Sequence, residues 1–338
     1  MLFLCLLLFW APAGTPLERA AEMIRTGRAG EALRILEVAG GSESERSYLR
    51  GAALFQLGRF PEAAGALERA LAGAPPGSAI QKEAPWMLGQ SLYLAGRLEE
   101  SIPWLEKASR VEPENIEVAY MLGAAHLLAG DPQKAVGAFA ALFGFEPDSA
   151  AAFLLAGRMA VRHELHTKAV AFLRRALTLD PRLPEAHYLL GITAVFQGDI
   201  KGGIREFEQE IAVNPNFAMA YYRLGEAYTR RNDWDRAVPE LQKAAWLNPD
   251  FSGPFILLGK AWLLRGKYRD AEGSLRRAIE MDPNNALAHY LLGQTLMRAG
   301  RTGEGRAMLK RAAELRRRAD EPPPLRRRDP AAPRLPEP

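Results

Sequence analysis

The sequence predicts an all-α fold built from a repeated unit of 34 residues. Seven glycines recur at this interval: Gly89, Gly123, Gly157, Gly191, Gly225, Gly259 and Gly293. A column of prolines keeps the same period: Pro113, Pro147, Pro181, Pro215, Pro249 and Pro283. The hydrophobic content of 48%, rich in alanine and poor in β-branched residues, favours closely packed helices. We therefore expect an array in which each unit contacts mainly its neighbours.

Each unit is expected to form two helices joined by a turn. With the recurring glycine at position 8, eight units begin at Ser44, Lys82, Ile116, Ala150, Pro184, Ala218, Ser252 and Ala286. Position 15 holds a residue that tolerates the left-handed conformation of a turn: Gly58, Gly96, Gly130, Gly198, Asn232, Gly266 and Gly300. The proline at position 32 ends the second helix. The one longer step, from Gly51 to Gly89, adds four residues in the inter-hairpin loop 74–78.

The second helix of each unit carries the expected core. Small residues recur at position 20: Ala63, Ala135, Ala169, Ala237 and Ala271. They recur again at position 27: Ala70, Ala108, Ala176, Ala244, Ala278 and Ala312. Position 24 is large and apolar: Leu67, Leu105, Phe139, Leu173, Phe207, Leu241, Leu275 and Leu309. We expect the small residues to allow close helix approach and the large one to fill the gap between a hairpin and its neighbour.

These columns resemble the tetratricopeptide repeat family over roughly residues 15–318. The resemblance implies helix-turn-helix hairpins stacked in a right-handed superhelical solenoid, whose first helices line a concave groove, and it implies no catalytic residues. The predicted organisation is a signal peptide over 1–13, a degenerate N-terminal helical hairpin over 15–43, eight repeats over 44–319 and a disordered tail rich in Pro and Arg over 320–338.

Two neighbouring units depart from the pattern. The unit starting at Pro184 has Gly203 at position 20 and Glu210 at position 27, where the family buries a methyl group. The unit starting at Ala150 has Glu164 at its turn and Ala156 at position 7. Because a buried charge without a partner is costly, we expect weaker packing or a bend here.

The N-terminus suggests export. MLFLCLLLFW is continuously apolar and is followed by Ala11-Pro12-Ala13, an A-x-A arrangement with cleavage expected after Ala13. The protein is then exported or periplasmic, and otherwise cytoplasmic. No Lys or Arg precedes the apolar run, and the run is too short to anchor the chain across a bilayer. The single cysteine, Cys5, excludes an internal disulfide framework.

The candidate partner-binding residues lie on the first helices, at positions 2, 5, 9, 12 and 13. Position 5 is largely aromatic: Tyr48, Trp86, Tyr120, Tyr188, Tyr222 and Tyr290, interrupted by Leu154 and Ile256. The later units add basic residues: Arg158, Arg162, Arg223, Arg230, Lys260 and Arg298, with Glu226 among them, whereas position 2 of the early units carries Glu45, Glu83 and Glu117. The rings suit either peptide capture or packing between hairpins, and the charges suit either an acidic ligand or an ordinary solvated surface.

Other function classes find little support in the sequence. The net charge of +4 comes largely from the tail, because the chain before Arg316 holds 37 basic and 36 acidic residues, so we expect no nucleic-acid partner. His163 and His166 lack the spacing of a zinc helix, and we expect no metal and no cofactor. No catalytic motif appears, which indicates a non-enzymatic scaffold or adaptor for a protein or peptide partner. The alternatives are a regulatory subunit of a separately encoded enzyme and an envelope assembly or carbohydrate-handling factor.

Overall fold

The computed structural model describes residues 14–320, and these form 18 α-helices and no β-strand. The chain divides into two compact units, whose described parts are residues 14–156, the N-terminal unit, and 157–320, the C-terminal unit. The predicted signal peptide over 1–13 lies outside the described residues, as does the predicted tail from residue 321 onward.

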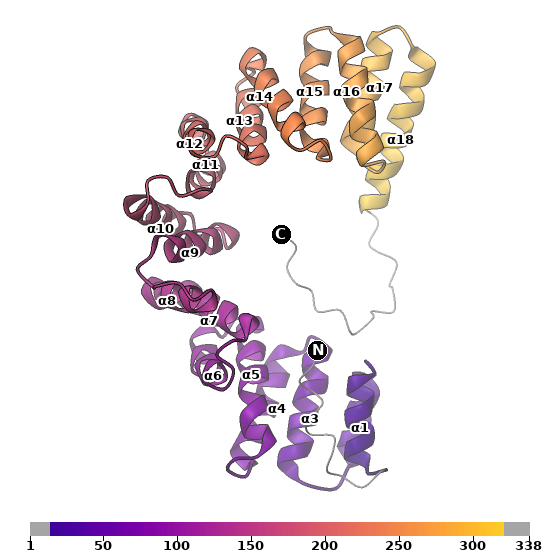
Figure 1. The fold of residues 1–338 in the computed structure, drawn as a ribbon. Helices are drawn as coiled ribbons and strands as arrows, with labels where there is room; N and C mark the ends of the chain where they lie inside the picture. Colours follow the sequence, from indigo (N-terminus) through magenta and orange to yellow (C-terminus); the bar gives the residue numbers. More distant parts are fainter. Residues whose placement is uncertain (1–13, 321–338) are drawn as a thin grey trace. The chain divides into compact units, whose positions relative to one another are not determined.

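The N-terminal unit contains four helical hairpins. Its helices are α1 (Pro16–Arg25), α2 (Ala29–Val38), α3 (Glu43–Gln56), α4 (Phe60–Gly73), α5 (Ala79–Leu94), α6 (Leu98–Val111), α7 (Ile116–Ala129) and α8 (Pro132–Leu142). The second helices α2, α4 and α6 contact the first helices on both sides, and the first helices α1, α3, α5 and α7 also contact one another in turn. The first helices therefore form one continuous layer in this unit (Figure 1).

The C-terminal unit repeats this arrangement. Its helices are α10 (His166–Leu179), α11 (Ala186–Phe196), α12 (Ile200–Val213), α13 (Ala218–Arg230), α14 (Trp234–Leu247), α15 (Ser252–Leu264), α16 (Tyr268–Met281), α17 (Ala286–Arg298) and α18 (Thr302–Asp320). Helix α9 (Ala150–Arg162) enters this unit at Gly157. The first helices α11, α13, α15 and α17 contact one another in turn, so they too form a layer.

The turns inside the hairpins adopt the predicted left-handed conformation. All six glycines expected at position 15 have positive φ, and so does Asn232, at 58°. Glu164, the irregular residue in this column, takes the same conformation with φ of 57°. A side chain in this region costs about 1 kcal/mol, which the surrounding hairpin tolerates here.

The position 8 glycines are required by contact with position 24 of the same hairpin. A Cβ atom on Gly225 would lie 2.6 Å from Leu241 Cγ, and one on Gly191 would lie 2.5 Å from Phe207 Cε1. The same clash recurs in all eight repeats of residues 44–319. The large residue therefore fills space inside its own hairpin, as well as the space towards the neighbouring hairpin that the sequence indicated.

The second helices end close to the position 32 proline, as the sequence predicts, with one exception. Ser42, Ser78 and Asn115 cap first helices with their side chains, and most second helices end two residues before the position 32 proline. Helix α8 ends at Leu142, five residues before Pro147, because Gly144 turns the chain with φ of 67°.

The expectation of weaker packing at Glu210 assumed a buried charge without a partner, and that assumption is wrong. Its side chain is fully buried, but its two oxygens accept hydrogen bonds from the backbone N–H groups of Glu185, at 2.7 Å, and Tyr188, at 3.1 Å. These are the N-cap and N3 groups of α11, which a helix cannot satisfy by itself. Glu210 thus makes from a neighbouring helix the pair of bonds that a capping box makes locally.

Candidate functional site

The first helices of each unit present side chains from positions 2, 5, 9, 12 and 13, which we call the first-helix face of that unit. In α3, α5 and α7 of the N-terminal unit these positions hold three glutamates and no Lys or Arg. In the C-terminal unit they hold Arg158, Arg162, Arg230, Lys260 and Arg298 against Glu185 and Glu226. The two units therefore carry first-helix faces of opposite charge.

Tyr48, the first of the predicted aromatic residues, is almost fully buried. It is 4% exposed, and its hydroxyl donates a hydrogen bond of 2.9 Å to Glu83 Oε2 of the next hairpin. Burial is the main cause that raises the pKa of Tyr48 above its ordinary value, and Glu83 adds to it. Tyr48 thus joins α3 to α5 and offers little surface to a ligand.

The other two early aromatics remain partly accessible. Trp86 and Tyr120 are half-buried, and so is Tyr93, at position 12 of α5. Burial is the main cause that raises the pKa of Tyr93, and Tyr120 lies near enough to raise it further. The sequence analysis did not name Tyr93 as a site residue, although it assigned position 12 to the same face and Tyr93 occupies that position.

Tyr188 and Tyr222 pack against the start of the next hairpin. Tyr188 meets Phe217 edge to face with ring centroids 5.0 Å apart, and Tyr222 meets Phe251 in the same way at 4.8 Å. Both phenylalanines occupy position 34, a recurrence that the sequence analysis did not use. Each half-buried tyrosine keeps one part of its ring accessible while the other part joins consecutive repeats.

Tyr290, in the last repeat, is half-buried and accepts a hydrogen bond of 2.8 Å from Gln294 Nε2. The Arg316 guanidinium lies over its ring, 5.2 Å from the centroid. This ring is therefore held from two sides, by its own helix and by α18.

Several of the predicted basic residues are paired. Arg158 forms an ion pair with Glu185, and Glu226 pairs with both Arg223, at 2.8 Å, and Arg230, at 3.1 Å. Burial acts most strongly on the Arg223 pKa and lowers it, but the Glu226 carboxylate and the Tyr188 hydroxyl together outweigh burial and raise that pKa. Arg223 also lies over the Tyr222 ring, 5.4 Å from its centroid.

The other predicted cations are exposed. Arg162, Lys260 and Arg298 lie on the solvent side of their helices. Within residues 14–320, Lys260 and Arg298 form no hydrogen bond or ion pair. These two side chains are therefore available to an anionic group.

Position 13 of the C-terminal unit alternates between cationic and apolar side chains. The series reads Arg162, Phe196, Arg230, Leu264 and Arg298. Phe196 is 64% exposed and Leu264 is 51% exposed, and the three arginines are exposed as well. Phe196 and Leu264 were not among the predicted site residues, although reading position 13 alone would have revealed them.

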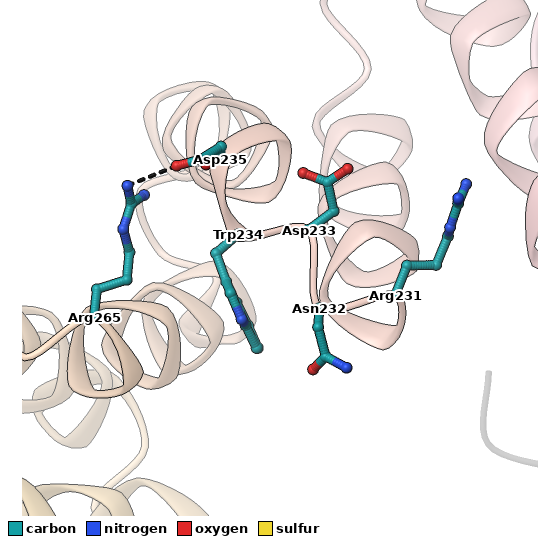
Figure 2. A pocket seen from close by; sticks show the side chains of 6 residues that line it. All are labelled: Arg231, Asn232, Asp233, Trp234, Asp235 and Arg265. Atoms are coloured by element: carbon teal, nitrogen blue, oxygen red, sulfur yellow. Dashed lines mark ion pairs between the residues drawn. The ribbon is translucent and has the colours of Figure 1, made fainter.

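A pocket of about 380 Å³ lies at the hairpin turns of α13–α14 and α15–α16. Figure 2 shows Trp234 between Arg265 and Asn232, with Asp235 paired to Arg265. Asp233, the second carboxylate that lines the pocket, caps α14 and accepts a hydrogen bond of 2.6 Å from Arg236 Nε. Because both carboxylates are already used by the fold, this pocket is a weaker candidate than the first-helix faces.

Comparison with protein-family models decides the family. A model described as a tetratricopeptide repeat matches residues 20–79, 48–114, 87–143, 120–184 and 188–250, and a second model of that description matches residues 263–321. The chain belongs to the tetratricopeptide repeat family. The predicted fold class, tandem helix-turn-helix repeats without strands over residues 14–320, is confirmed.

Several solved structures resemble about half of this tetratricopeptide repeat chain. YrrB, described as a TPR protein with an unusual peptide-binding site, is 23% identical with a TM-score of 0.46, covering 50% of this chain and 88% of that chain. A MamA protein is 21% identical with a TM-score of 0.47, and the match covers 51% of this chain and 94% of that chain. MamA from Desulfovibrio magneticus RS-1 is 22% identical with a TM-score of 0.48, and the match covers 51% of this chain and 98% of that chain. None of the curated proteins matches the chain.

Two further observations concern metal ions and membranes. Among the described residues of the repeat array, no group of three or more His, Cys, Asp or Glu side chains is arranged to hold a metal ion. Between residues 14 and 320, no helix combines the length and the apolar character that crossing a bilayer requires.

Proposed function

We propose that this tetratricopeptide repeat protein is a non-enzymatic scaffold or adaptor, and that the first-helix face of its C-terminal unit binds a segment of a partner protein with alternating acidic and apolar residues. The position 13 series, from Arg162 to Arg298, carries this proposal. A surface that alternates cations with exposed Phe and Leu side chains is complementary to a ligand that alternates carboxylates with apolar groups.

The exposed apolar side chains account for affinity in this proposal. Burying Phe196 and Leu264 under a ligand removes apolar surface from water, which contributes more to binding than rim charges do. The arginines between them orient the ligand and speed its encounter. The paired residues Arg223 and Glu226 hold the face in shape beside Tyr222.

A random-peptide display library panned against the full chain tests the proposal. We expect selected peptides to be enriched in Asp and Glu, with apolar residues between them. The double variant Phe196→Ser and Leu264→Ser should weaken binding of a selected peptide at least about tenfold, as expected for loss of two buried apolar contacts. Arg230→Gln with Arg298→Gln should slow association and reduce its salt dependence.

The matched control places the same change on second helices. Arg269→Gln and Arg306→Gln remove exposed cations from α16 and α18, and should leave peptide binding unchanged. If selection yields no acidic peptides, or if both double Arg variants behave alike, the proposal is wrong. Position 13 is a better test than Tyr188 and Tyr222, because those rings also pack against Phe217 and Phe251.

The proposal extends to the cellular location. A protein with the apolar segment MLFLCLLLFW and an A-x-A site would act outside the cytoplasm. Sequencing the N-terminus of the mature protein tests this: a start at Gly14 supports export, and a start at Met1 contradicts it.

A further inference from the structure

The N-terminal unit carries a second surface that the proposed function does not use. We call it the acidic aromatic face, made of Glu83, Trp86, Tyr93, Glu117 and Tyr120. Glu83, Trp86 and Tyr93 follow one another along one side of α5, at intervals of three and seven residues. Helix α7 contacts α5, and Tyr120 of α7 lies near enough to Tyr93 to affect its pKa, so the surface continues from α5 to α7.

Among the residues that the structure describes, neither Glu83 nor Glu117 of this face forms an ion pair. Glu83 is held by the Tyr48 hydroxyl and lies near a second carboxylate, Glu112. Burial is the main cause that raises the Glu83 pKa, and the negative charge of Glu112 raises it further. Glu117, at position 2 of α7, is exposed. A positive ligand group would relieve this accumulation of negative charge.

The aromatic rings of the face are half-buried and lie on the same two helices as these carboxylates, α5 and α7. Half-buried Trp and Tyr rings are the surfaces against which proline-rich segments dock in the polyproline II conformation, and arginine guanidinium groups also stack on them. Acidic side chains beside such rings favour a proline-rich ligand that carries Arg. The chemistry of the ligand is thereby specified: prolines for the rings and arginines for the carboxylates.

The chain itself contains such a segment. Residues 322–336 read PPPLRRRDPAAPRLP, with six prolines, four arginines and one acidic residue. Three consecutive prolines favour the extended polyproline II conformation, which loses little conformational entropy on binding. The segment follows the last helix, α18, which ends at Asp320.

We propose that residues 322–336 bind to the acidic aromatic face of the N-terminal unit, with the prolines against Trp86, Tyr93 and Tyr120 and the arginines beside Glu83 and Glu117. The segment acts as a built-in occupant of this face and competes with any external ligand of the same chemistry. The proposal is independent of the proposed function, which uses the other unit and a ligand of opposite charge.

The test uses a fluorescent peptide of residues 320–338 and full-length protein. The variant with Arg326→Glu, Arg327→Glu and Arg328→Glu keeps the chain length but repels its own segment from the face. We expect the peptide to bind this variant, and fluorescence anisotropy measures the affinity. Because the wild-type protein carries a competing copy of the segment, we expect the peptide to bind it at least about tenfold more weakly than it binds the variant.

Matched variants locate the site. In the charge-reversed chain, Glu83→Gln with Glu117→Lys removes both carboxylates of the face, and Gln keeps an acceptor for the Tyr48 hydroxyl, so we expect peptide binding to weaken at least about tenfold. Glu68→Gln with Glu99→Lys makes the same changes on the second helices α4 and α6 and should have little effect. A peptide with Pro322→Gly, Pro323→Gly and Pro324→Gly should bind several-fold more weakly.

The outcomes are distinguishable. Absence of peptide binding to the charge-reversed chain overturns the proposal, as does equal weakening by the two pairs of Glu variants. Protection of the wild-type face in a protein that stays monomeric assigns the occupant to the same chain. Self-association of the wild-type protein that the three Arg→Glu changes abolish assigns it to a second copy, and both of these results support the proposal.

Discussion

Two adjacent hairpins, α11–α12 and α13–α14, follow the same 34-residue repeat, but their first helices begin at different positions of that repeat. Helix α13 begins at position 1, with Ala244 buried at position 27 of its partner helix. Helix α11 begins two positions later, after Glu185 in the left-handed conformation, and the buried residue at position 27 is Glu210. The carboxylate is tolerated because the later start leaves two N–H groups directed at it.

The comparison shows that a departure from a repeat pattern is best judged together with the backbone it meets. Glu210 in isolation contradicts the pattern of small residues at position 27. Together with the N-cap Glu185 and the N3 residue Tyr188, it completes a helix start that has no side-chain cap of its own. Four predictions test this difference between the hairpins, beginning with the largest expected effect.

Placing the carboxylate in the regular hairpin should be the most damaging change. In Ala244→Glu, the new side chain would be buried beside α13. The Tyr222 N–H, which corresponds to that of Tyr188, is the fifth of α13 and therefore already donates a hydrogen bond within the helix. We expect a loss of about 3–5 kcal/mol of stability, as for an uncompensated buried charge. Urea denaturation followed by circular dichroism measures it, and a loss as small as that of an exposed variant such as Lys260→Glu would contradict the comparison.

Removing the carboxylate from the irregular hairpin should cost less. Glu210→Ala restores the small residue of the repeat pattern but leaves the Glu185 and Tyr188 N–H groups without their acceptor. We expect about 2 kcal/mol of destabilisation, concentrated at the first turn of α11. Hydrogen exchange measured by mass spectrometry should show faster exchange there than in the first turn of α13. Unchanged exchange would mean that the cap has no energetic role.

The stability contributed by Glu210 should depend on pH. Burial is the main cause that raises its pKa above the ordinary value of 4.5, and the two N–H groups oppose this only in part. Because the folded protein holds the proton more tightly, this contribution is fully present below pH 4.5 and is lost as the pH rises through the raised pKa. The stability of the wild type relative to Glu210→Gln should therefore fall over that range, by at most about 1.4 kcal/mol per pH unit. A difference that stays constant or rises with pH would contradict the assignment.

Exchanging the turn residues should have the smallest effect. Gly198 has φ of 87° in the irregular hairpin and Asn232 has φ of 58° in the regular one. Gly198→Asn and Asn232→Gly should each change stability by about 0.5 kcal/mol or less, in opposite directions, because Asn tolerates the left-handed region better than other side chains do. Thermal unfolding of both variants checks the sign. A change well above this size would show that the turn side chain makes contacts beyond its own backbone.

The repeat columns predicted the helix order, the left-handed turns and the glycine contacts because these depend on residues at fixed spacing within one hairpin. The role of Glu210 could not be predicted, since it requires the left-handed φ of Glu185 and the resulting shift of the helix start. The packing of Tyr188 on Phe217 could have been predicted from the sequence, because Phe217 and Phe251 both occupy position 34. The pairing of Arg158 with Glu185 depends on side-chain placement that spacing does not determine.

The contact between the position 8 glycine and the position 24 side chain joins residues only sixteen positions apart, as Gly191 and Phe207 show. Contacts of such short sequence separation have low contact order and form quickly. A hairpin can therefore close as soon as its own residues have left the ribosome, and each one offers the next a finished surface on which to dock.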